Sequence, residues 1–376
     1  LALAAGSGRG GEAAEESCRE DAVRQGAWRP RLRFEAYSDG RPSGAPVYGG
    51  GFLAAAFERE GFELERTGED WDLLWTHRPQ VASLLARERL APRPRGHLRL
   101  LNQCGYFRAA GQKCYFAGHV NRVASALAEE PARARRFTYL RNYVLNHDNQ
   151  RRRWLQEVEA DPDRPWVYKV CNAGLSQGVE ILRGAELLER ARAGRPATWA
   201  VAQEYAEPYL GVGGKKFHLR VYVLVAGWAP PGRRVFVFDE GLVFRSRFRY
   251  DAATTTSRRD VFSAVSPDVD ALTHADVWNA IDADSDVALA GATSLSATVR
   301  ARLLDVVREL FDPAAVERSV GRAEDFVAKL AAAGLACFDL LGLDVMLNTR
   351  LEPLVLEEAK LGAELRPLNR EAYDAY

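Results

Sequence analysis

The stretch CFDLLGLDVMLNTRLEPLVLEE, residues 337–358, sets two acidic residues into apolar runs that a short polar turn separates. The runs Leu341–Leu347 and Pro353–Glu358 are typical of buried strands, and the turn between them predicts a hairpin. Asp344 and Glu357 then face each other from its two arms. Buried charges are costly unless they are paired or metal-bound, and a hard cation relieves the repulsion between two carboxylates. The hairpin therefore indicates either a metal site or two arms with one solvated side.

A second cluster of charge lies on the predicted strand Lys216–Val225, whose residues alternate with period two. Side chains two and four residues apart on a strand point to the same face, so Lys216, His218 and Arg220 share one. Such a face is unusual in a protein core and natural beside a polyphosphate. A solvated strand face is the alternative interpretation of these residues alone.

Two further segments carry weaker signals. Lys169 lies on the predicted strand Trp166–Val170, and a loop of small residues follows it, an arrangement that suits a lid over phosphates. Gln203-Glu204-Tyr205 ends the predicted strand Trp199–Tyr205, where backbone groups could read the edge of an adenine base. Taken singly, neither pattern is specific.

Other segments complete the pattern of a mixed α/β (α+β) protein. We expect a hairpin formed by Arg234–Phe238 and Gly241–Phe244, with Asp239-Glu240-Gly241 as its turn. Helices are predicted over Ser296–Phe311 and Ala323–Ala333. The chain then returns to strands in the hairpin described first.

The N-terminal third divides in two. Residues 1–30 are rich in Gly, Ala and Glu, and we expect them to be poorly ordered. A first α/β unit begins at Arg31, and the segment PRPRGH at Pro92–His97 marks its end. The chain opens LALAAGSGRG without Met, as a fragment or the remainder of a removed signal or anchor would.

Composition excludes several functional classes. The 376 residues are 47% hydrophobic and 27% charged, the balance of a globular protein of two or three units. Lys and Arg number 51, as do Asp and Glu, whereas a nucleic-acid binder would show a basic excess. No apolar run reaches the roughly 18 residues of a membrane helix.

The cysteines are few and scattered. There are five, with no C-x-x-C pair, which argues against a zinc ribbon. An odd and sparse set also argues against a disulfide scaffold and favours an intracellular protein.

Eight short motifs, in order along the chain, resemble those of the tubulin-tyrosine-ligase-like family. They are Trp71-Asp72-Leu73-Leu74-Trp75; Asn102 with Lys113; Trp166-Val167-Tyr168-Lys169 with Ser176 and Gly178; Gln203-Glu204-Tyr205 with Pro208; Lys216-Phe217-His218-Leu219-Arg220; Glu240-Gly241-Leu242; Cys337 to Asp344; and Leu356-Glu357. The resemblance extends from residue 65 to residue 365. Each motif is short, but eight in the family's order are hard to produce by chance.

The resemblance implies an ATP-grasp fold. Its parts would be a small N-terminal α/β domain over residues 31–98, a central domain over 99–202, and a C-terminal nucleotide and metal domain over 203–376. Implied ATP-binding residues are Lys169 at the α- and β-phosphates, Ser176 and Gly178 in the following loop, Gln203, Glu204 and Tyr205 at the adenine, and Lys216 and His218 beside the nucleotide. Arg220 and Glu357 are the implied catalytic residues, and Asp344 and Glu357 the implied Mg²⁺ ligands.

The implied activity is that of an ATP- and Mg²⁺-dependent carboxylate–amine ligase. Enzymes of this type phosphorylate a carboxylate, and an amino group then attacks the acyl-phosphate, so that cations and metal must neutralise the transferred phosphoryl group. Implied partners are tubulin or another protein acceptor and an amino acid, with no nucleic acid and no membrane span. The implied location is cytoplasmic, with microtubule or cilium association.

Several residues depart from the family's pattern. His218 replaces an Asp, Val170 a Pro, Glu180 a loop Gly, Phe244 an Arg, and Ala359 the Asn that would be a third metal ligand. Water can replace one oxygen ligand of Mg²⁺. Two alternatives therefore stand beside a tubulin ligase: a catalytically degenerate binding module, and an ATP-grasp ligase with another acceptor.

Overall fold

The computed structural model describes most of the chain between residues 30 and 360. The described residues are 30–38, 41–43, 50–64, 71–76, 99–102, 104, 112–171, 178–192, 199–228, 233–246, 248–252, 272–284, 294–320 and 323–360. Residues 1–29, which were expected to be poorly ordered and include Cys18, lie outside these ranges. Ser176, one of the predicted ATP-binding residues, also lies outside them.

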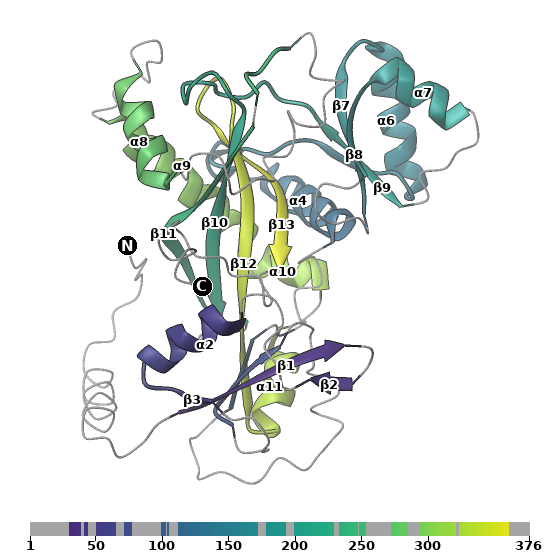
Figure 1. Ribbon diagram of the computed structural model, residues 1–376. Helices are drawn as coiled ribbons and strands as arrows, with labels where there is room; N and C mark the ends of the chain where they lie inside the picture. Colours follow the sequence, from purple (N-terminus) through teal and green to yellow (C-terminus); the bar gives the residue numbers. More distant parts are fainter. Residues whose placement is uncertain are drawn as a thin grey trace.

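Four antiparallel strands form the centre of the molecule. They are β10 (Phe217–Ala226), β11 (Arg234–Arg245), β12 (Leu335–Leu347) and β13 (Pro353–Lys360), in the order β11-β10-β12-β13. The alternation read from Lys216 onward matches β10, whose Leu219, Val221 and Val223 are buried in the main core. The predicted terminal hairpin is confirmed as β12 and β13 (Figure 1).

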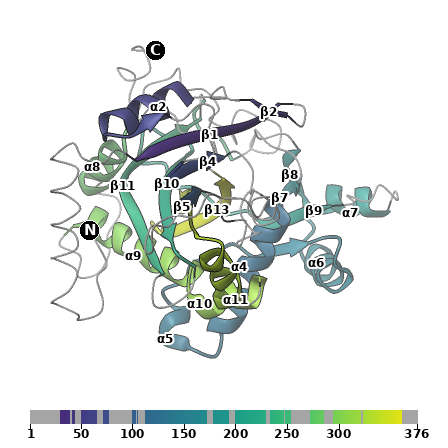
Figure 2. The same ribbon diagram turned by 90° about the horizontal axis from the view of Figure 1, so that it is seen from below.

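The N-terminal strands extend this same sheet. They are β1 (Arg31–Ser38), β2 (Arg41–Ser43), β3 (Glu63–Leu64), β4 (Leu73–Thr76) and β5 (Arg99–Asn102). β5 pairs in parallel with the first residues of β12, and β4 and β1 follow it across the sheet, as the view from below shows (Figure 2). Backbone hydrogen bonding in this sheet therefore extends from β1 to β13. The predicted domain limits, at residues 98 and 202, stay a prediction.

A separate four-stranded sheet forms one arm of the molecule. Its strands are β6 (Asn142–Val144), β7 (Pro165–Val170), β8 (Val179–Arg183) and β9 (Ala200–Glu204), in the order β6-β9-β7-β8. Helices α6 (Asp148–Ala160) and α7 (Gly184–Arg192) cover one face (Figure 1). Trp154 of α6 and Trp166 of β7 are packed edge to face in the core between them. The opposite face of this small sheet is turned toward β13.

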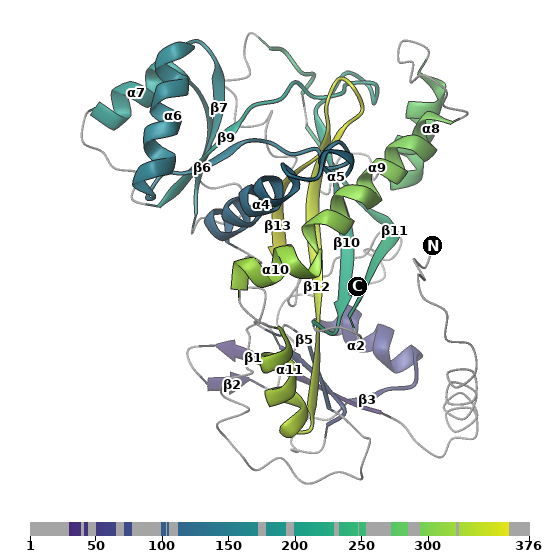
Figure 3. The same ribbon diagram turned by 180° about the vertical axis from the view of Figure 1, so that it is seen from behind.

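Helices cover the rear of the long strands (Figure 3). They are α4 (Lys113–Leu127), α5 (Pro131–Ala134), α8 (His274–Ala283), α9 (Leu295–Leu310) and α10 (Pro313–Val320). Val299 and Val306 of α9 pack into the same core as Val221 and Leu343 of the sheet. Lower down, α2 (Gly50–Arg59) and α11 (Ala323–Ala332) lie on opposite sides of the N-terminal strands (Figures 1 and 3). The expected mixed α/β class is confirmed, in the two-sheet form that an ATP-grasp protein requires.

The predicted hairpin through Asp239-Glu240-Gly241 is wrong, because these residues belong to one continuous strand, β11. The register with β10 passes from Gly241 opposite Val221 to Val237 opposite Val223, so the three residues between them form a bulge rather than a turn. Gly241 explains the bulge, because a Cβ there would lie 2.2 Å from the carbonyl oxygen of Arg220. Only glycine allows the two strands to approach so closely.

The sequence argument against a disulfide scaffold is also wrong, since four of the five cysteines are joined. Cys104 bonds to Cys337, and Cys114 bonds to Cys171. The partners are 233 and 57 residues apart in sequence, and connectivity over such distances cannot be deduced from spacing. The cysteine count therefore gives no support to an intracellular location. Among the described helices, none has the length and apolar character that crossing a bilayer requires.

Replacing Gly241 by alanine should destabilise the protein by about 2 kcal/mol or more, because the added methyl group would overlap the carbonyl oxygen of Arg220 and the ring of His274. Gly118, in the middle of α4, is the matched control, since a Cβ there meets only the Arg122 side chain at 3.5 Å. Gly118→Ala should be neutral or stabilise by up to about 1 kcal/mol. Urea denaturation of the two variants compares them, and equal unfolding free energies would contradict the close approach at Gly241.

Candidate functional site

The predicted site residues gather where β10, β12 and β13 face the small sheet. Asp344 and Glu357 are directly opposite each other in the register of β12 and β13, so both carboxylates lie on one face of the hairpin. Arg220 is opposite Asp344 on the other side of β12. Their role as metal ligands stays a prediction. Within the described part of the chain, no group of three or more His, Cys, Asp or Glu side chains is arranged to hold a metal ion.

Asp344 is almost fully buried and is held by Arg220. Its Oδ1 accepts a hydrogen bond from Arg220 Nε at 2.5 Å, and its Oδ2 accepts one from Nη2 at 3.1 Å. Burial alone would lower the pKa of Arg220, but the charge and hydrogen bonds of Asp344 outweigh it and raise that pKa. A two-point contact of this kind fixes both side chains in orientation as well as in charge.

A β-bulge in β13 turns one carbonyl group toward the small sheet. Glu357 is opposite Asp344, but the next pair is Val355 with Val345, so Leu356 is an extra residue. Its carbonyl oxygen accepts hydrogen bonds from Lys169 Nζ at 2.8 Å and from Gln203 Nε2 at 3.3 Å. Lys169 is on β7 and Gln203 on β9 of the small sheet. The bulge therefore supplies the acceptor that joins the two sheets beside the carboxylates.

Three lysines complete the cluster. Lys113, the first residue of α4, has its Nζ 3.8 Å from Glu357 Oε2. Burial lowers the pKa of Lys169, and the charge of Lys113 lowers it further, against the opposing effect of Glu357. Burial and the charge of Lys169 lower the pKa of Lys216 to about 8. Lys216 Nζ also lies 5.0 Å from the centre of the Tyr205 ring.

These contacts give the site an excess of positive charge in little water. Burial lowers the pKa of Lys169 and of Lys216, and an anionic ligand beside them would offset the cost of their positive charges. Gln203 Oε1 is buried and, among the described residues, accepts no hydrogen bond, so the site also offers a polar group of the kind a base edge needs. Amines, a guanidinium, two carboxylates and a spare acceptor fit the chemistry of ATP with Mg²⁺.

Two departures from the family pattern are neighbours in space. His218 and Phe244 are directly opposite each other on β10 and β11, with their rings stacked at 5.0 Å. The Arg220 guanidinium lies 5.2 Å from the same Phe244 ring. Burial lowers the pKa of His218, and His218 Nε2 is 3.8 Å from Asp344 Oδ2. The stacked pair of His218 and Phe244 thus occupies the two positions at which the resemblance implies an Asp and an Arg.

The remaining predicted residues are not all aimed at the site. Glu204 forms ion pairs with Arg141 and Arg164, so its carboxylate is directed to those two arginines. Although burial opposes ionisation, the hydrogen bond from Arg141 lowers the pKa of Glu204. The Tyr205 hydroxyl lies 2.7 Å from that of Tyr250. Gly178 has a φ of 64°, a backbone conformation that favours glycine.

Glu180, which replaces a loop glycine of the family, is drawn away from the site. Its carboxylate pairs with Arg190 of α7 at 2.8 Å. Its negative charge is therefore compensated locally on the helix-covered face of the small sheet, where Glu180 lies opposite Tyr168.

Sequence patterns alone missed three contributors. In the sequence, Lys113 is recognised only as part of a family motif and not as a site residue. Its position at the start of an amphipathic helix could have indicated that role. The Leu356 carbonyl depends on a bulge that no side-chain pattern encodes. Asn142 accepts from Gln203 Nε2 at 2.9 Å and so orients that side chain, a contact between strands far apart in sequence.

Comparison with known proteins bears on the same region. The sequence model of the tubulin-tyrosine ligase family matches residues 112–358. Tubulin polyglutamylase ttll6 of Danio rerio is 28% identical over 321 residues, and tubulin monoglutamylase TTLL4 of Mus musculus is 22% identical over 312 residues. Each match covers 80% of this chain, but only 37% and 24% of those relatives' own lengths.

Lys216→Met should stabilise the ligand-free protein at pH 7 by about 2 kcal/mol, because a partly buried charge with a lowered pKa is removed. The folded-state pKa of Lys216 is about 8, against an ordinary 10.5, so the unfolded chain binds more protons between these values. The cost of the charge is therefore full below pH 8 and disappears as the pH rises toward 10.5. Urea midpoints at pH 7, 9 and 10 measure this, with Lys215→Met as the control. An advantage of Lys216→Met that stays constant over this range would contradict the assignment.

Proposed function

This chain belongs to the tubulin-tyrosine ligase family, and we propose that it is an ATP- and Mg²⁺-dependent ligase that joins an amino acid to a carboxylate of a protein. The observation that carries the proposal is the meeting of Lys113, Lys169, Lys216 and Arg220 with two carboxylates between two sheets. A solvated strand face, the alternative interpretation of the sequence, does not account for a face on which the His218 and Arg220 side chains are 17% and 18% exposed and burial lowers the pKa of Lys216.

The cationic side chains would hold the nucleotide. Lys169 and Lys216 lie close enough for each to influence the other's charge, and both belong at the phosphates. Gln203 Oε1 offers an acceptor to the exocyclic amine of the base, and the Tyr205 ring covers the Lys216 amine. By the resemblance, Ser176 and Gly178 would lie in the loop over the phosphates. Gly178 has a φ of 64°, a conformation open to few other residues.

The carboxylates would hold the metal. Asp344 and Glu357 present oxygen atoms from one face of the hairpin, and waters and phosphate oxygens would complete the six ligands that Mg²⁺ requires. Bound ATP and Mg²⁺ would supply a phosphoryl group that activates the acceptor carboxylate as an acyl-phosphate for attack by an amino group. Arg220, oriented by Asp344, would stabilise the charge on that group, and Lys113 and Glu357 would keep their pairing at the edge of the site.

The relatives suggest the second substrate and the acceptor. One is named a tubulin polyglutamylase and another a tubulin monoglutamylase. We therefore take glutamate as the amino acid and a tubulin carboxylate as the acceptor. An acceptor of this kind would place the protein at microtubules.

One observation favours a second candidate, a family member that binds nucleotide or partner without turnover. His218 and Phe244 form a stacked aromatic pair where the family pattern has an Asp and an Arg, and Ala359 takes the position of a metal-binding Asn. ADP release that depends on added acceptor and glutamate distinguishes the ligase from the binding module.

Lys169→Ala should weaken ATP binding by roughly 10- to 100-fold, because a buried cation at the phosphates is lost in ground state and transition state alike. Glu357→Gln should change ATP affinity little and lower turnover by roughly 100-fold, because the metal acts most on charge that develops during transfer. Calorimetric titration with Mg²⁺-ATP and steady-state ADP release measure the two effects.

Lys329→Ala, an exposed lysine on α11, is the control for loss of a positive charge and should change neither quantity. Equal losses of affinity in Lys169→Ala and Glu357→Gln would contradict the separate roles. A wild-type protein that binds no Mg²⁺-ATP would contradict the proposed function as a whole.

A further inference from the structure

The disulfide between Cys114 and Cys171 lies beside the candidate nucleotide site. Cys114 is the second residue of α4, and Cys171 is the first residue after β7. Their Cα atoms are 5.4 Å apart, an ordinary distance for a disulfide. The bond therefore ties the first turn of a helix to the end of a strand in the small sheet, two segments that no regular backbone pairing joins.

Each cysteine adjoins a lysine of the site. Lys113 directly precedes Cys114, and its amine is 3.8 Å from Glu357. Lys169 stands two residues before Cys171, and its amine donates to the Leu356 carbonyl. The two lysines thus meet neighbouring residues of β13, and the disulfide fixes the distance between the segments that carry them.

The bond is also well packed. Cys114 and Cys171 are 4% and 3% exposed, in a small cluster with Val144 of β6 and Val201 of β9. The backbone N–H of Cys171 donates to the carbonyl oxygen of Trp199 at 3.0 Å, which anchors the end of β7. Because this hydrogen bond already anchors the end of β7, the main effect of the disulfide is on the first turn of α4. Loss of the disulfide would therefore release the end of the helix that carries Lys113.

We infer that Cys114 and Cys171 form a redox-sensitive clamp on the nucleotide site, an inference that rests on the proposed function. In the disulfide form, Lys113 and Lys169 are held in place before the nucleotide arrives, and less conformational freedom is lost on binding. In the dithiol form, the first turn of α4 is free to move, and the affinity for ATP is lower. The affinity of the protein for ATP then depends on the thiol–disulfide balance of its surroundings.

The chemistry is ordinary thiol–disulfide exchange. A thiolate of glutathione or of a small dithiol attacks one sulfur, the other cysteine leaves as a thiolate, and a second reductant thiolate releases the mixed disulfide. Two electrons and two protons pass to the cysteines, and the reductant departs as its own disulfide. Because both cysteines are buried, attack requires local opening, so exchange is slower than at an exposed disulfide.

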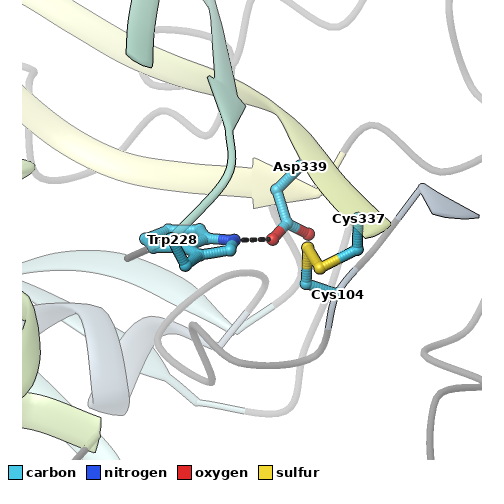
Figure 4. The surroundings of a disulfide bond; sticks show 4 residues. All are labelled: Cys104, Trp228, Cys337 and Asp339. Atoms are coloured by element: carbon cyan, nitrogen blue, oxygen red, sulfur yellow. Dashed lines mark hydrogen bonds between the residues drawn. A yellow bond between two sulfur atoms is a disulfide. The ribbon is translucent and has the colours of Figure 1, made fainter. Parts of the chain in front are cut away.

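The second disulfide provides an internal control. Cys104–Cys337 joins the end of β5 to β12 and lies next to the side chain of Asp339, which accepts a hydrogen bond from the Trp228 indole (Figure 4). No site lysine adjoins Cys104 or Cys337 in sequence. A general effect of reduction on stability would act through either bond, whereas the clamp acts through Cys114–Cys171 alone.

Binding affinity and redox equilibrium must be coupled in both directions. If the disulfide form binds ATP more tightly by some factor, saturating ATP shifts the disulfide equilibrium by the same factor. A tenfold effect corresponds to a shift of about 30 mV for a two-electron couple. This second readout requires no substitution and no catalytic activity.

The test uses the full chain equilibrated in glutathione buffers of graded redox poise. We expect the Kd for Mg²⁺-ATP to rise roughly tenfold when Cys114–Cys171 is reduced, with the thiol state of each pair measured by alkylation and mass spectrometry. Cys114→Ala with Cys171→Ala should bind with the weaker affinity at every poise. Cys104→Ala with Cys337→Ala should keep the full redox dependence.

Equal Kd values for the oxidised and reduced wild-type protein would overturn the clamp and leave the proposed function standing. Loss of the redox dependence in the Cys104 and Cys337 variant, but not in the other, would overturn it as well. If either double variant fails to fold, the deciding measurement is the effect of ATP on the thiol–disulfide equilibrium of Cys114 and Cys171 in the wild-type protein. The absence of a shift in that equilibrium would contradict the inference. Absence of ATP binding in both redox forms would instead contradict the proposed function, and the clamp with it.

Discussion

The contact on which the site depends is the pair of hydrogen bonds that one carbonyl group of β13 accepts from the small sheet. Lys169 and Gln203 both donate to Leu356, the extra residue of a β-bulge. Among the described strands β13 pairs with β12 alone, so outward carbonyl groups of β13 are available to the small sheet, and the bulge sets the position of the one at Leu356. The bulge thus joins the sheets at the position where Glu357 comes into register with Asp344.

Charge balance follows from that geometry. Arg220 holds Asp344, and Lys113 stands near Glu357, so each carboxylate has a cation of its own. Lys169 donates to a carbonyl oxygen, Lys216 lies over an aromatic ring, and burial lowers the pKa of both. A polyphosphate bound with its metal would offset the cost of placing these two amines close together and out of water.

The sequence revealed those parts of the structure that depend on local pattern. The terminal hairpin follows from its apolar runs, and the face shared by Lys216, His218 and Arg220 follows from the period of two. What it could not reveal depends on contacts between distant segments: the bulge at Leu356, the close approach at Gly241, and the joining of Cys114 to Cys171.

In β11 the local signal was misleading, since Asp239-Glu240-Gly241 has the composition of a turn but the packing of Gly241 against Arg220 keeps the strand continuous. Single motifs placed the candidate residues in order, but only the fold shows that Lys113 belongs with them and that the Glu204 carboxylate pairs elsewhere.

The central claim is that the phosphates of ATP lie between β13 and the small sheet, and an affinity label tests it most directly. An acyl-phosphate derivative of ATP acylates amines that lie beside the phosphates of the bound nucleotide, and peptide mass spectrometry identifies the modified lysines. We expect modification at Lys113, Lys169 or Lys216, and protection of the same residues by unmodified Mg²⁺-ATP. Modification confined to other lysines, or modification of these three that excess ATP does not prevent, would contradict it.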